Sequence, residues 1–104
     1  MLLKHDVKIA GIKPELMMGL MVADTLYNEA GVNLVVTSVL DSKHSRTSRH
    51  YIGFAADLRT RDLPNPKAMA DRLAKELPEF YVVLECEGEP NQHLHMQFNG
   101  TYPS

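Results

Sequence analysis

The chain has 104 residues, of which 44% are hydrophobic and 23% are charged, and its formal net charge is −2. This size and composition predict a single globular domain over residues 1–104, and they exclude a disordered tail. The small negative charge leaves no basic footprint, so we expect no nucleic-acid partner.

The chain carries one cysteine, Cys86, which cannot form an internal disulfide and therefore suits a reducing compartment. We expect a buried, inert thiol there, although a lone thiolate could also ligate a metal. Residues 1–16 lack the basic segment and long apolar run of a signal peptide, and no window approaches the ~18 apolar residues of a transmembrane helix. These features predict synthesis in the cytoplasm and no membrane insertion.

The first half of the chain predicts a helix, a strand and a long loop. Pro14 suits the first turn of a helix over residues 13–31, and Gly31 suits its end. The apolar residues at helical spacing in this segment are Leu16, Leu20, Ala23 and Tyr27. Residues 32–39, VNLVVTSV, are rich in β-branched side chains and predict a mostly buried strand. Residues 40–53 lose all periodicity and predict a loop long enough to suggest function.

The second half predicts strand, helix, strand, turn and strand. FAADLRT (54–60) has strand alternation, and residues 62–78 predict a helix that Asn65 caps and Pro78 ends. EFYVVLECE (79–87) and HLHMQF (93–98) predict two further strands around the turn at 88–92. This order has no regular βαβ repetition. It predicts an α+β domain with a mainly antiparallel sheet and helices packed on one face.

Strand alternation brings chemically active side chains to one face of this sheet. In residues 93–98, His93 and His95 share one face, and the apolar residues between them belong to the other. In residues 54–60, Asp57 faces the same way as Ala55 and Arg59. If these strands are neighbours, Asp57 and His95 point into one hollow.

A third histidine, His50, lies in the preceding loop and can reach this hollow. Two histidines and a carboxylate are a recurrent ligand set for catalytic zinc, which keeps a fourth position for water. Each part of the pattern is weak alone, because alternate histidines are common on exposed strands. A domain whose histidines bind no metal is the competing interpretation, so the joint pattern carries the metal prediction.

The joint pattern also resembles a known family. Residues 48–57 read SxHxxGxAxD, and with the later HxH they closely resemble the zinc D-Ala-D-Ala carboxypeptidase/endopeptidase family, which belongs with lysostaphin-type peptidases and the hedgehog signalling domain. The resemblance covers about residues 37–98 and is closest to small phage- or prophage-type members. It implies a hedgehog/D-Ala-D-Ala peptidase-like fold, one Zn²⁺ per chain and hydrolysis of peptide bonds in the peptidoglycan stem.

The resemblance also implies roles for single residues. His50, Asp57 and His95 correspond to the zinc ligands. His93 corresponds to the catalytic histidine that assists the attacking water or the tetrahedral intermediate. Ser48 corresponds to a serine that braces the loop by hydrogen bonding.

Two positions depart from the family pattern. Many relatives carry a carboxylate three residues before the last zinc ligand, where it acts as the general base, and this chain has Gln92 there. Either His93 takes that role or a nearby acid does, the candidates being Glu85, Glu87 and Glu89. Larger relatives also place an arginine shortly after the strand that contains Thr37, aimed at the developing oxyanion. The residues that could replace it here are Lys43, His44, Arg46 and Arg49.

The sequence therefore leaves two functions open. The first is a zinc peptidase whose partners are peptidoglycan or its stem peptides, acting as a D-Ala-D-Ala carboxypeptidase or an L,D-endopeptidase. Synthesis in the cytoplasm and action on the cell wall after release would suit a phage endolysin. The alternative is a non-catalytic zinc-binding virion or interaction domain, which the glutamine at position 92 favours.

Overall fold

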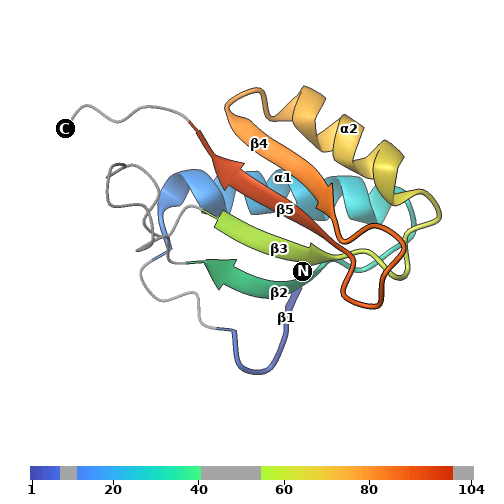
Figure 1. Cartoon of the computed structure of the whole chain (residues 1–104). Helices are drawn as coiled ribbons and strands as arrows, with labels where there is room; N and C mark the ends of the chain where they lie inside the picture. The colour runs from blue at the N-terminus through green and yellow to red at the C-terminus, as the bar shows by residue number, and fades with distance from the viewer. Residues whose placement is uncertain (8–11, 41–54, 100–104) are drawn as a thin grey trace.

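The computed structural model describes residues 1–7, 12–40 and 55–99. Two helices and a five-stranded sheet build one α+β domain, and the strands follow the spatial order β1-β2-β3-β5-β4 (Figure 1). The element bounds are β1 Leu2–Leu3, α1 Pro14–Glu29, β2 Val35–Leu40, β3 Ala55–Arg59, α2 Pro66–Glu76, β4 Phe80–Glu85 and β5 His93–Phe98. The predicted α+β class is thus confirmed, and the sheet is mixed because β1 runs parallel to β2 while the other pairings are antiparallel.

Both helices begin and end where local chemistry favours it. Pro14 occupies the first turn of α1, and Gly31 follows its end with a φ of 77°, a conformation that costs glycine little. The side chain of Asn65 caps α2 by accepting a hydrogen bond from the Ala68 amide at 3.1 Å. The α2 helix ends at Glu76, slightly earlier than Pro78, the predicted end.

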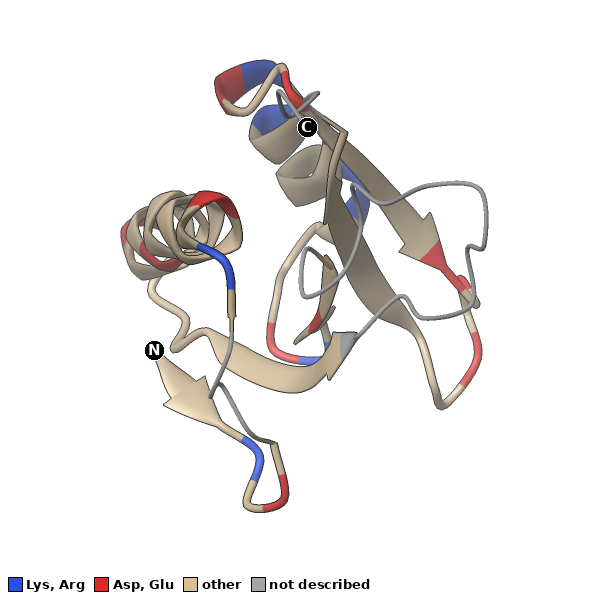
Figure 2. Cartoon of the chain, turned by 90° about the vertical axis from the view of Figure 1, so that its left-hand side faces the viewer, with Lys and Arg blue, Asp and Glu red and all other residues tan. Residues whose placement is uncertain are grey.

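The two faces of the sheet differ in polarity. Leu94, Met96 and Phe98 of β5 are buried, whereas the alternate residues of the same strand are half-buried on the opposite face. Figure 2, which shows α1 nearly end-on, places both helices on one side of the sheet. The core between the helices and the sheet includes Leu16, Leu20, Leu73, Leu94 and Met96. The other face of the sheet, which no described helix covers, is left for polar side chains.

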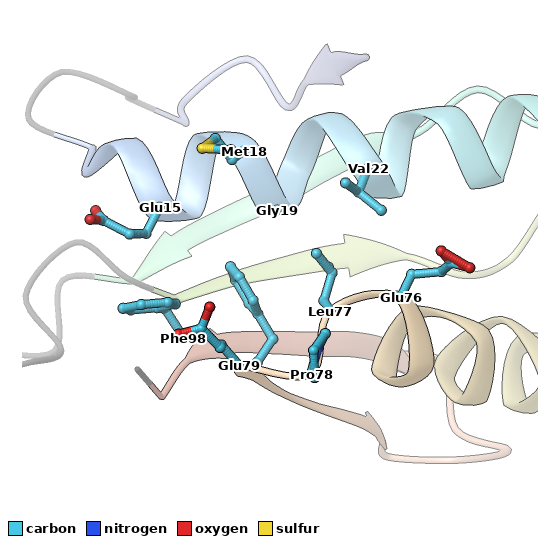
Figure 3. A pocket seen from close by; sticks show the side chains of 10 residues that line it. Glu15, Met18, Gly19, Val22, Glu76, Leu77, Pro78, Glu79 and Phe98 are labelled. Carbon is cyan, nitrogen blue, oxygen red and sulfur yellow. The ribbon is translucent and has the colours of Figure 1, made fainter. Parts of the chain in front are cut away.

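Helix α1 approaches the sheet closely at Gly19. A Cβ atom at this position would lie 2.5 Å from Cζ of Phe80, so a side chain here would collide with the ring. Phe80 also packs edge-on against Phe98, with ring centroids 5.5 Å apart. Beside this contact, an apolar groove of about 250 Å³ separates α1 from the segment between α2 and β4 (Figure 3).

No sequence pattern predicts β1. This strand consists of Leu2 and Leu3 alone. Two backbone hydrogen bonds hold it against β2: the Leu2 amide donates to the Leu34 carbonyl at 2.8 Å, and the Lys4 amide donates to the Val36 carbonyl at 2.9 Å. Two residues carry no detectable alternation, so only the pairing with β2 reveals the strand. Neither α1 nor α2, the helices of the described chain, is long and apolar enough to cross a membrane.

Candidate functional site

Strand register brings the candidate residues of β3, β4 and β5 together on the polar face of the sheet. Asp57 of β3 lies directly opposite His95 of β5. Two residues earlier in β5, His93 lies between Arg59 of β3 and Glu85 of β4. We call Asp57, Glu85, His93 and His95 the polar cluster. Because directly opposite residues have Cβ atoms ~4.5–5.5 Å apart, their side chains can all interact.

The most buried contact in the polar cluster joins Asp57 to His95. Oδ1 of Asp57 lies 2.9 Å from Nδ1 of His95 and 3.8 Å from Nε2 of His93. The side chains of Asp57 and His95 are only 18% and 13% exposed, so water screens this charged contact little. One carboxylate oxygen is therefore shared between two imidazole rings.

The shared carboxylate favours the protonated form of His95. Its hydrogen bond to Asp57 raises the pKa of His95 above the ordinary value of 6.5, and this effect outweighs the desolvation that lowers it. On the other side of the ring, Nε2 lies 3.3 Å from Oε1 of Gln97. Both ring nitrogens thus face oxygen atoms, an arrangement that suits an imidazolium ion.

His93 is held in a similar way by different partners. Its Nδ1 lies 2.9 Å from the carbonyl oxygen of Asn91, and its Nε2 lies 2.9 Å from Oε1 of Glu85. Desolvation lowers the pKa of His93, but the Asn91 carbonyl, with the charges of Asp57 and Glu85, raises it more. Since a carbonyl and an ionised carboxylate only accept hydrogen bonds, these contacts also favour a doubly protonated ring.

Gln92, the residue that replaces the expected carboxylate, has a structural role here. Its Nε2 donates to Oγ1 of Thr60 at 2.9 Å, and its Oε1 accepts a hydrogen bond from the Gly88 amide at 2.9 Å. These bonds tie the β4–β5 turn to the end of β3. Among the three acids that the sequence offered as substitutes, Glu85 is the one that contacts His93, whereas Glu87 and Glu89 are exposed in the turn.

The predicted three-ligand metal site is described only in part. Asp57 and His95 lie in contact, but the third predicted ligand, His50, lies outside the described residues. The other loop residues with predicted roles, Ser48, Lys43, His44, Arg46 and Arg49, lie outside them as well. Within residues 1–7, 12–40 and 55–99, no three His, Cys, Asp or Glu side chains are placed to hold a metal ion. The zinc site therefore stays a prediction.

The donor atoms of Asp57 and His95 nevertheless fit zinc. Zinc takes imidazole nitrogen and carboxylate oxygen at ~2.0–2.2 Å with tetrahedral angles, so two ligands of one ion lie ~3.3 Å apart. The observed 2.9 Å between Oδ1 of Asp57 and Nδ1 of His95 differs from this by a few tenths of an ångström. A small side-chain movement would let a metal ion replace the proton between them.

A hollow of about 440 Å³ adjoins the polar cluster. We call it the basic hollow, because Lys4, Arg59 and Arg61 line it together with Asp57 and His93. The remaining lining residues are Thr37, Pro90, Asn91 and Gln92. Strand alternation predicts that Arg59 shares the face of Asp57. No sequence pattern predicts that Lys4 and Arg61 join them, since only the folded sheet brings these cations together.

Comparisons with protein-family models, with curated proteins and with solved structures find no match to this chain. The resemblance carried by residues 48–57 and by the HxH of β5 therefore stays a prediction. The described geometry of the polar cluster stands independently of it.

Proposed function

We propose that this chain is a zinc-dependent peptidase that hydrolyses peptide bonds of the peptidoglycan stem, as a D-Ala-D-Ala carboxypeptidase or L,D-endopeptidase of endolysin type with the hedgehog/D-Ala-D-Ala peptidase-like fold. The contact between Asp57 and His95, with His93 beside it, is the observation that carries this proposal. Two supposed ligands on neighbouring strands share a face and a hydrogen bond, although they are far apart in sequence. The motif in residues 48–57 supplies the third ligand, His50.

Each residue of the site has a distinct part in the proposed reaction. His50, Asp57 and His95 would hold the ion. Zinc, when bound, lowers the pKa of water towards ~7 and polarises a carbonyl group. His93 would hold or deliver a proton at Nε2, and Glu85, at 2.9 Å from that atom, would orient the ring and exchange the proton with it. The N–H at Nε2 of a protonated His93 would donate a hydrogen bond to the oxygen that becomes negative.

The proposal is tested by mass spectrometry of the peptides that the chain releases from purified peptidoglycan. We expect defined stem-peptide products from the zinc-loaded chain and none from the His50→Ala variant, and the product masses identify the bond. Release that is equal with and without zinc would contradict the zinc mechanism.

Variants within the polar cluster separate metal binding from catalysis. His95→Ala should lose zinc, whereas His93→Ala should keep zinc and lose a factor of about 10²–10⁴ in rate, the usual contribution of a general acid or base. Glu85→Gln should also keep zinc and lose rate, and Glu87→Gln, exposed in the adjacent turn, is its matched control. Loss of zinc in His93→Ala would mean that the roles of the two histidines are reversed.

The second candidate function is a non-catalytic zinc-binding virion or interaction domain. The contacts of Gln92 favour it, because this side chain cannot act as a base and is occupied with Thr60 and Gly88. The two candidates differ only in turnover, since both bind zinc. One zinc per chain without any peptide release would support the second candidate.

A further inference from the structure

The basic hollow carries an excess of positive charge next to the polar cluster. Lys4 follows β1, Arg59 ends β3 and Arg61 follows it, so the three cations come from two separate parts of the chain. The one acidic residue that lines the hollow is Asp57, and His95 already engages its carboxylate. The three cations therefore face a single carboxylate among the residues that line the hollow, and that carboxylate is already bound to His95.

None of these cations forms an ion pair with an acid of the described chain. Arg72 of α2 provides the contrast, because it lies 3.7 Å from Glu29 and 3.6 Å from Glu76. Cations gathered in a concave surface focus the electrostatic potential and attract anions from solution. The hollow is thus arranged to accept a negatively charged group.

The position of Arg59 relates this anion site to the proposed reaction. Arg59 lies opposite His93, and it shares its face of β3 with Asp57, two residues earlier. Two residues of a strand span ~6.6 Å, which is about the length of two residues of an extended peptide. A guanidinium group pairs with a carboxylate through two parallel hydrogen bonds, so it can fix a ligand in both position and orientation.

We propose that the basic hollow binds a free carboxylate of the peptide substrate, one or two residues from the cleaved bond, with Arg59 as its main contact. The identity of the peptide rests on the proposed function, whereas the recognition of a carboxylate rests on the hollow itself. Lys4 and Arg61 strengthen the attraction. The carboxylate belongs either to the C-terminus of the peptide or to an acidic residue within it.

The test titrates the ¹⁵N-labelled, zinc-loaded full chain with stem peptides ending in D-Ala-D-Ala and follows binding by NMR. One peptide has all its carboxylates free, a second has only its C-terminus amidated, and a third has only its internal carboxylate amidated. Mass spectrometry of the same samples reports cleavage, and kcat/KM replaces Kd for any peptide that is cleaved. We expect one of the two amidations to weaken binding, or to lower kcat/KM, by about tenfold or more.

Variants assign this preference to the hollow. Arg59→Gln should remove the difference between the free and the amidated peptide, and Lys4→Gln and Arg61→Gln should reduce it. Arg72→Gln, on α2, should leave it unchanged. Added salt should also reduce it in the unaltered chain. A melting curve of each variant verifies its fold.

Three results would overturn the inference: equal behaviour of all peptides, a full preference retained in Arg59→Gln, or neither binding nor cleavage of any peptide. Cleavage without a carboxylate preference would overturn this inference and leave the proposed function standing. A carboxylate preference that depends on Arg59, without cleavage of any peptide, would support this inference and contradict the proposed function.

Discussion

At the scale of single residues, the site depends on a carboxylate that two imidazole rings share. Asp57 lies on the polar face because residues alternate along β3, and the register with β5 puts it opposite His95. Alternation alone predicted which side chains face the same way. It did not predict which acid would reach His93, because Glu85 is selected by the register of β4 against β5, which alternation along a single strand does not determine.

The raised pKa of His95 predicts how zinc affinity depends on pH. A metal ion must displace the proton from Nδ1, so affinity is highest above the raised pKa and falls about tenfold per pH unit once the ring is protonated. The decline should therefore begin above pH 6.5, the ordinary histidine value. Competition with a chromogenic chelator between about pH 5 and 8 measures it.

The metal-free chain should respond to pH in the opposite direction. Because folding raises the pKa of His95, the Asp57 contact stabilises the fold fully below about pH 6.5, and this contribution is lost as the pH rises through the raised value. Urea unfolding of the metal-free chain across that pH range measures the trend, and the Gln97→Ala variant, in which the Asp57 contact is intact, should retain it.

For the zinc-affinity prediction, an affinity that stays flat down to about pH 5 would contradict a site built on His95.

At the scale of elements, the sequence predicted the order of both helices and of four strands. The hydrophobic period switches clearly between the helices and strands, and Asn65 marks the start of α2 by its chemistry. Two features of the sheet were not predicted. The strand β1 is too short to show a period, and the register of β2 shifts between Val36 and Ser38, an irregularity that depends on the partner strand.

The contact of α1 with the sheet predicts that Gly19→Ala destabilises the fold. The new Cβ would meet the Phe80 ring at 2.5 Å, and overpacking costs about 1–3 kcal/mol, while alanine returns about 1 kcal/mol through its higher helix propensity. We expect a net loss of about 1 kcal/mol in urea unfolding. In a Phe80→Leu background the same substitution should be neutral or stabilising. A loss of equal size in both backgrounds would locate the strain elsewhere.

At the scale of the whole molecule, a hydrogen bond joins helix α1 to strand β3, one of the three strands that carry the polar cluster. The hydroxyl of Tyr27 in α1 donates to the backbone carbonyl of Arg59 at 2.8 Å, and burial raises the pKa of Tyr27 well above its ordinary value. The sequence predicted Tyr27 as part of the apolar stripe of α1. Its polar partner could not be predicted, since the two residues meet only when the helix packs on the sheet.

Tyr27→Phe should lower the free energy of unfolding by about 1–2 kcal/mol, because the carbonyl of Arg59 loses a buried donor. For a domain of this size, each kcal/mol of lost stability lowers Tm by roughly 4–8 °C. Thermal unfolding followed by circular dichroism measures it. Tyr81→Phe is the matched control, because Tyr81 is 51% exposed, and its Tm should not move. Equal Tm values for the two variants would show that the buried bond contributes nothing.

The separation of the sheet into an apolar face and a polar face has an evolutionary consequence. Asp57, Glu85, His93 and His95 are not part of the apolar core, so selection for core packing and selection for chemistry at the polar face act on different sets of residues. A lineage that carries this domain can therefore change the chemistry of the polar face through one or two point mutations while the core still packs. Natural variants should therefore diverge faster at the polar cluster than in the core.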